Sequence, residues 1–187
     1  LPFDRYMATV LYAPGLGYYA NASRKFGALP QSGSDFVTAP EMSPLFGATL
    51  AGSVADALQA TGTTEVWEFG AGSGALAAQL LEALGDRVAR YTIVDLSGSL
   101  RERQRERLAA FGDKVQWASE LPESITGVVV GNEVLDAMPV QLLHFDGAQW
   151  FERGVSVRDG RFVWSDRPSA LRPPVAGPFM PGTVTEI

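Results

Sequence analysis

The chain of 187 residues contains no cysteine and a single histidine, His144. Disulfides and thiolate metal sites are therefore excluded, and so is a metal site built from several histidines. No Gly-x-Ser-x-Gly turn occurs, so the sequence shows no sign of the common serine hydrolases. From these absences we predict no metal site.

Long apolar runs and an excess of positive charge are also missing. A membrane-spanning helix needs about 18 consecutive apolar residues, and no apolar run is that long, so we expect no membrane insertion. The 15 Lys and Arg against 21 Asp and Glu give a formal net charge of −6. An acidic surface repels phosphate backbones, so nucleic acid is not an expected partner.

Strand and helix patterns alternate through the middle of the chain. The predicted strands are short and apolar, and each predicted helix is followed by a glycine. The expected strands are 65–69, 91–94, 115–117 and 128–130, and the expected helices are 44–61, 75–84 and 100–111. This alternation predicts an α/β fold with a doubly wound parallel sheet.

The two flanks of this region have a different character. A short helix is predicted within residues 1–12 and mostly loop within 13–42, whereas Asp146-Gly147 marks a hairpin turn of an antiparallel meander. A proline-rich stretch, 167–182, reads as an extended connector. We expect three parts. Residues 1–62 form an N-terminal helical and loop segment that covers the ligand site, 63–139 form a Rossmann-like core, and 140–187 form the meander with its connector. The first and last residues, Leu1 and Ile187, suggest a fragment of a longer protein.

The first candidate site is the glycine-rich turn that follows Glu68. Gly70, Gly72 and Gly74 lie between a predicted strand and a predicted helix. Glycine permits a tight turn and close approach of a ligand, and the helix N-terminus presents free N–H groups. Asp95 ends the next strand about twenty residues later, where an acid accepts the hydroxyls of an adenosine ribose. The pattern fits a nicotinamide dinucleotide or S-adenosylmethionine (SAM), and a turn without any ligand would explain the glycines alone.

Glu68 favours SAM over the dinucleotide. An acid two residues before the first glycine is typical of the SAM motif, and a carboxylate could complement the ammonium group of SAM. Trp117 and Ala118 follow the third strand, where they could border an adenine. Core packing explains Trp117 equally well.

Two further segments carry polar groups. Asn132, Glu133 and Asp136 follow the fourth strand, whose carboxyl end borders the ligand crevice of an open α/β sheet. A methyl acceptor would meet the sulfonium there, although a solvated loop would also explain the acids. Residues 34–44, which include Glu41, belong to an unusually long loop that is either functional or a plain connector. The arginine-rich helix beyond residue 100 is interpreted as a solvated face.

Taken together, these segments resemble the MidA-like family, whose mitochondrial members assist assembly of respiratory complex I. The matching segments are 11–19, 35–41, 68–74, 94–97 and 131–139. One departure is Ser34, where the family often has glycine. The resemblance implies a class I methyltransferase fold that uses SAM as its cofactor, with Leu96 and Asn132 added to the cofactor-binding residues.

The resemblance also implies a protein arginine as the methyl acceptor, because the mitochondrial relatives are taken to methylate an arginine of a complex I subunit. Asn132, Glu133 and Asp136, with Glu41 folding over them, would then bind the guanidinium and act in catalysis. A nicotinamide-dependent oxidoreductase and a non-catalytic assembly factor remain as alternatives. We expect a cytoplasmic protein if it is bacterial and a mitochondrial one if it is eukaryotic, and the oligomeric state is left open.

Overall fold

The computed structural model describes residues 1–20, 37–95 and 98–187. The chain divides into two compact units, Leu1–Asn21 with Ala137–Ile187, and Ala22–Asp136. This division differs from the three expected segments. The helix before the first strand packs on the helix after it and so shares the core of the second unit, whereas the first residues of the chain pair with the antiparallel meander.

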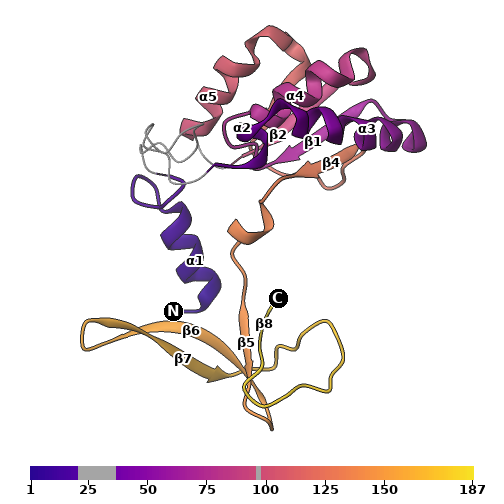
Figure 1. Cartoon of the computed structure of the whole chain (residues 1–187). Helices are drawn as coiled ribbons and strands as arrows, with labels where there is room; N and C mark the ends of the chain where they lie inside the picture. The colour runs from indigo at the N-terminus through magenta and orange to yellow at the C-terminus, as the bar shows by residue number, and fades with distance from the viewer. Residues whose placement is uncertain (21–36, 96–97) are drawn as a thin grey trace. The chain divides into compact units, whose positions relative to one another are not determined.

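The unit Ala22–Asp136 contains, within its described residues, a four-stranded parallel sheet of order β3-β2-β1-β4, of which Figure 1 labels β2, β1 and β4. Its strands are β1 (Glu65–Phe69), β2 (Arg90–Val94), β3 (Val115–Ala118) and β4 (Val128–Gly131). β1 lies in the centre, with β2 on one side and β4 on the other. The chain therefore reverses its direction of strand addition between β1 and β4, the type of position where open α/β sheets bind ligands.

Helices cover one face of this sheet and form the core with it. The helical elements are α2 (Ala39–Met42), α3 (Pro44–Thr61), α4 (Ala75–Leu84), η2 (Gly85–Arg87), α5 (Gly98–Leu108), η3 (Ala109–Lys114) and η4 (Leu135–Ala137). α4 contacts both α3 and α5. Val66, Tyr91 and Ile93 from the strands are fully buried, and Leu80 of α4 packs in the same cluster. On the opposite face of the sheet, Val129 is 53% exposed.

Capping residues set the ends of the helices where the sequence predicts them. Ser43 caps α3 by accepting a hydrogen bond from the Leu45 amide (3.2 Å), and Pro44 occupies the first helical position. Gly62 ends the same helix in the left-handed conformation, with φ of 65°. α2 lies in a stretch predicted as loop, because four residues are too few to show a helical pattern.

The other unit contains, in its described part, an antiparallel sheet of order β7-β6-β5-β8. Its elements are α1 (Phe3–Tyr12), β5 (Leu142–Phe145), β6 (Trp150–Arg158), β7 (Arg161–Pro168) and β8 (Val184–Glu186). The predicted meander is therefore present, and β8 pairs with β5 after the proline-rich stretch. The rings of Phe3 and Tyr6 lie 5.7 Å from those of Trp164 and Phe162, respectively, so α1 packs against β7.

Two findings concern the described residues alone. Their helices are all too short or too polar to cross a bilayer. They also hold no cluster of three or more His, Asp or Glu that could bind a metal ion.

Candidate functional site

The loop between β1 and α4 is a tight glycine turn. Gly70, Gly72 and Gly74 have φ of 62°, 55° and 81°, a region that favours glycine. The Gly70 amide donates to the Val94 carbonyl at the end of β2 (3.0 Å), and the Gly74 amide donates to Ala71 (2.8 Å). α4 begins directly after Gly74, so its unpaired N–H groups lie at this turn.

The segment after β4 packs against the glycine turn through one side chain. A Cβ placed on Gly70 would lie 2.8 Å from Cγ2 of Val134, and one placed on Gly131 would lie 2.9 Å from Cγ1. Both distances are shorter than real Cβ contacts, so both positions favour glycine. Because Val134 fits between them, Asn132 and Glu133 lie close to the glycine turn.

The three polar residues of this segment differ in exposure. Asn132 is half-buried, whereas Glu133 and Asp136 are exposed. Glu133 has φ of 53°, which is uncommon for a residue other than glycine. The backbone thus turns sharply at Glu133, and both carboxylates can meet a ligand that arrives from solvent.

Glu68 and Tyr91 form a buried pair beneath the turn. Glu68 is 2% exposed and accepts a hydrogen bond from the Tyr91 hydroxyl (2.8 Å). Burial raises the pKa of Glu68 to about 7; the Tyr91 hydrogen bond opposes this rise, and the charge of Asp95 adds to it. Burial, followed by the charge of Glu68, also raises the pKa of Tyr91. The Glu68 carboxylate therefore lies in the core directly before the turn, and its expected contact with the cofactor stays a prediction.

Gln104 of α5 joins three parts of the site and is not among the residues that the sequence analysis selects. Its side chain is fully buried. Nε2 donates to Oδ2 of Asp95 (2.8 Å) and to the carbonyl of Gly72 (2.9 Å), and Oε1 accepts from Nε1 of Trp117 (2.9 Å). Asp95, itself 8% exposed, is thus linked to the glycine turn and to β3.

A signal for Gln104 is present in the sequence. Leu100, Gln104 and Leu108 are spaced by four residues, the spacing of one helical face, and all three are buried. Gln104 is also an uncharged residue within a run of Arg and Glu. An amide on the apolar stripe of a charged helix indicates a buried hydrogen-bonding role.

Arginines of α5 contact the ends of β2 and β3 at the site. Arg101 donates to the carbonyls of Asp95 (2.8 Å) and Ala118 (3.0 Å), which joins the ends of β2 and β3. The Arg105 guanidinium lies 5.2 Å from the centre of the Trp117 ring. The arginines of this helix are therefore more than a solvated face, and the contacts of Trp117 are those of core packing beneath α5.

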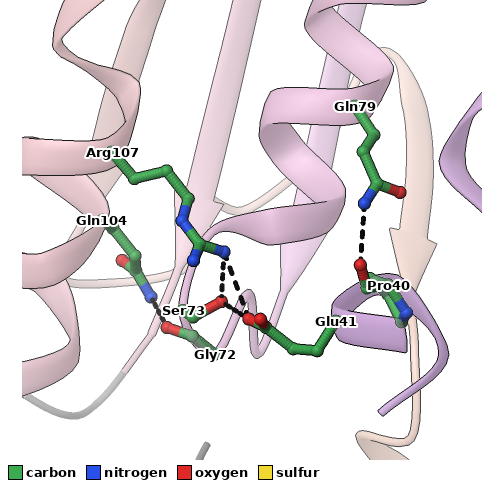
Figure 2. Close-up of polar contacts among 7 residues, drawn as sticks. All are labelled: Pro40, Glu41, Gly72, Ser73, Gln79, Gln104 and Arg107. Carbon is green, nitrogen blue, oxygen red and sulfur yellow. Dashed lines mark hydrogen bonds and ion pairs between the residues drawn. The ribbon is translucent and has the colours of Figure 1, made fainter. Parts of the chain in front are cut away.

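Hydrogen bonds of Glu41 connect α2 to the glycine turn. The Glu41 carboxylate accepts hydrogen bonds from the Ser73 hydroxyl and from Arg107 of α5 (3.1 Å). Arg107 also donates to Ser73 (2.7 Å), so the three side chains form a closed cluster (Figure 2). The Glu41 side chain is 10% exposed. These contacts differ from the expected position of Glu41 over the acids that follow β4.

A second residue ties α2 and α3 to α4. The Gln79 amide donates to the Pro40 carbonyl (2.7 Å) and accepts from the Gly47 amide (2.9 Å), and Figure 2 shows the first of these bonds. A Cβ on Gly47 would lie 2.3 Å from Cβ of Gln79, so α3 can approach α4 this closely only with glycine there. Of the remaining predicted positions, Leu96 and residues 34–36 lie outside the described residues.

The arrangement suits a ligand that contains adenosine. An acid at the end of β2, a glycine turn and a helix N-terminus meet beside the reversal point between β1 and β4. Asp95 can accept hydrogen bonds from hydroxyls, and at its three glycines the turn offers backbone that no side chain shields. The residues present therefore fit the nucleoside and the amino-acid part of SAM.

The family model described as "Putative S-adenosyl-L-methionine-dependent methyltransferase" (Methyltransf_28) matches residues 49–182. The chain belongs to this family. The match agrees with the resemblance to MidA-like proteins, and it identifies SAM as the cofactor. It gives no support to the nicotinamide alternative.

Individual relatives agree with this assignment. A Burkholderia thailandensis protein crystallised with S-adenosyl-homocysteine (SAH) is 57% identical with a TM-score of 0.81, and the match covers 92% of this chain and 46% of that one. The mitochondrial protein arginine methyltransferase NDUFAF7 homologue of Caenorhabditis elegans is 30% identical, over 83% of this chain and 42% of its own length. The Drosophila melanogaster homologue of the same name is 28% identical, with coverages of 81% and 40%. The chain thus spans less than half the length of each of these relatives. The class I methyltransferase fold expected from the sequence is confirmed.

Proposed function

We propose that the intact protein transfers a methyl group from SAM to an arginine side chain of a protein substrate. The observation that carries this proposal is the meeting of the glycine turn, Asp95 and the acids after β4 at one edge of the parallel sheet. The names of the animal relatives support the arginine class. Their mitochondrial location supports a mitochondrial compartment for a eukaryotic protein, and the family resemblance supports a role in complex I assembly.

On the cofactor side, each residue has a proposed task. Asp95 accepts hydrogen bonds from the ribose hydroxyls, and the glycine turn lets the amino-acid part of SAM approach the backbone. Ala118 borders the adenine, a role that the family resemblance also implies for Leu96, and Asn132 contacts the cofactor near its reactive end. Glu68 and Trp117 support this edge from the core.

On the acceptor side, the exposed acids have the required chemistry. SAM supplies an electrophilic methyl carbon on a sulfonium. A guanidinium is protonated at pH 7 and is a poor nucleophile. Glu133 and Asp136 can bind its N–H groups in a bidentate manner, which localises positive charge away from the attacking nitrogen. As the N–C bond forms and the C–S bond breaks, that nitrogen loses a proton to one of these carboxylates, and SAH leaves.

The variant Glu133→Gln tests the proposal because it keeps the shape and removes the charge. We expect SAM affinity to remain unchanged while transfer of the labelled methyl group falls by about 10²- to 10⁴-fold. The assay uses the intact protein, labelled SAM and a host lysate, followed by mass spectrometry of the products. Glu123→Gln, on an exposed residue between β3 and β4, is the matched control and should leave transfer unchanged.

Two results would contradict the proposal in different ways. Wild-type turnover by Glu133→Gln, or a methylated product that is not arginine, would exclude arginine as the acceptor held by these acids. Tight SAM binding without any transfer by the unmodified protein would instead favour the non-catalytic assembly factor.

A further inference from the structure

Both N–H groups of the Gln104 side-chain amide are hydrogen-bonded. A buried amide is costly unless its polar atoms are paired. Both N–H groups of Nε2 have acceptors, Asp95 and Gly72, and Oε1 has a donor, Trp117. The partners belong to the three segments proposed to bind the cofactor, namely the glycine turn, the end of β2 and β3.

Trp117 determines which way the Gln104 amide faces. An indole nitrogen can only donate a hydrogen bond, so the amide atom that faces Nε1 must be the oxygen. The amide nitrogen then necessarily points toward Asp95 and Gly72. A flipped amide would place N–H against N–H at Trp117 and oxygen against oxygen at Asp95, so the observed orientation is strongly preferred.

The position of the Asp95 carboxylate depends on this amide. Asp95 is 8% exposed and lies near the Glu68 carboxylate, a repulsive neighbour when both are ionised. The Gln104 donor stabilises the charged form of Asp95 and fixes its Oδ2, while Arg101 holds the Asp95 carbonyl. The same amide fixes Gly72, so the acid and the turn keep a constant separation.

We propose that Gln104 is a positioning residue for adenosine recognition: oriented by Trp117, it holds the Asp95 carboxylate and the Gly72 carbonyl where the ribose hydroxyls and the turn-bound part of SAM require them. This inference rests on the proposed function, and it assigns to Gln104 a role in which its amide bonds to protein groups of the site while Trp117 orients it. Affinity for the ribose should therefore depend on Gln104 and Trp117.

The experiment measures binding by the intact protein to SAH and to an SAH analogue that lacks both ribose hydroxyls. Gln104→Glu keeps the shape and the acceptor for Trp117 but removes both donors. Trp117→Phe keeps the bulk and removes the donor that orients the amide. Asp95→Ala serves as the reference for a lost ribose contact. Gln59→Glu, on the exposed side of α3, is the control for the same chemical change.

We expect Gln104→Glu and Trp117→Phe to weaken SAH binding by about tenfold or more, as loss of a charge-assisted hydrogen bond does. Their effect on the analogue should be much smaller, and Asp95→Ala should show the same discrimination. Equal losses for SAH and the analogue would reduce Gln104 to a purely structural residue and overturn the inference. If Gln104→Glu does not fold, Trp117→Phe decides the question, because unchanged SAH affinity in that variant would also overturn it. Failure of the unmodified protein to bind SAH would instead contradict the proposed function.

Discussion

Glu68 brings a titratable carboxyl group into the core of the parallel sheet, where its partner is the Tyr91 hydroxyl. Burial disfavours the charged form of a carboxyl group and so raises its pKa, here from 4.5 to about 7. Glu68 therefore couples the stability of the sheet to pH.

The stability of the protein should carry a pH-dependent contribution from Glu68. Between pH 4.5 and 7 the folded state binds the Glu68 proton more tightly than the unfolded state, so the free energy of unfolding falls as pH rises through this window. The full loss is about 3 kcal/mol. In Glu68→Gln this contribution is absent, and the amide oxygen can still accept the Tyr91 hydrogen bond.

Urea unfolding of both proteins at pH 5 and pH 8 checks this prediction. The stability of Glu68→Gln relative to the unmodified protein should increase with pH, because other titrating groups contribute equally to both and cancel. A difference that is the same at both pH values would show that Glu68 does not titrate in the core.

The positions of individual residues could be predicted where spacing alone determines them. The three glycines and Asp95 follow from the order of strand, turn, helix and strand, and the structure places them together. The side of the sheet on which Glu68 and Trp117 lie could not be predicted. In a short parallel strand both faces are apolar, so the sequence does not show which face a side chain joins.

At the scale of secondary-structure elements, α2 shows how a four-residue helix gains a fixed position. Its hydrogen-bond partners, Ser73, Gln79 and Arg107, are all more than thirty residues away in sequence. Such long-range partners have no local signature, so Glu41 could be selected from the sequence but its contacts with Ser73 and Arg107 could not. Helices α3 and α4 were predicted because their apolar residues and glycine ends are local, whereas α5 ends at Leu108, before the predicted end at Gly112, and is followed by η3.

The Glu41 cluster should contribute more to the order of α2 than to global stability. Arg107 is 40% exposed, so its ion pair is screened and is worth about 1 kcal/mol or less. Glu41→Gln should therefore lower the free energy of unfolding only slightly. Amide hydrogen exchange in α2 should become several-fold faster, because local opening then breaks neutral hydrogen bonds in place of stronger, charge-assisted ones.

Exchange measured by mass spectrometry on peptides that contain α2 checks this prediction. Glu82→Gln on the exposed side of α4 is the control and should leave α2 unchanged. Unchanged exchange in Glu41→Gln would mean that the charge of Glu41 does not help to hold α2 in place.

At the scale of the whole molecule, the proposed binding residues are confined to one of the two compact units. Every residue proposed to bind SAM or the acceptor belongs to the unit Ala22–Asp136. In the other unit, the first residue of the chain pairs with β6. The Leu1 nitrogen donates to the Val155 carbonyl (2.9 Å), and the Val155 amide donates to the Leu1 carbonyl (2.8 Å). Gly154 permits this pairing, because a Cβ there would lie 2.3 Å from the Leu1 carbonyl oxygen.

Gly154→Ala should consequently destabilise the antiparallel unit and leave cofactor binding intact. The obstacle is backbone, which cannot rotate away as a side chain can, so we expect a loss of about 1–3 kcal/mol. Gly52→Ala is the matched control, because a Cβ there meets nothing within 4 Å and alanine in an exposed helix stabilises by about 0.5–1 kcal/mol. Thermal unfolding should thus shift in opposite directions for the two variants, while SAH affinity measured by calorimetry should equal that of the unmodified protein in both. If Gly154→Ala weakened SAH binding at a temperature where the protein is folded, the site would depend on the antiparallel unit. The acids after β4 would then be the first residues to test, because the chain leads from them directly into that unit.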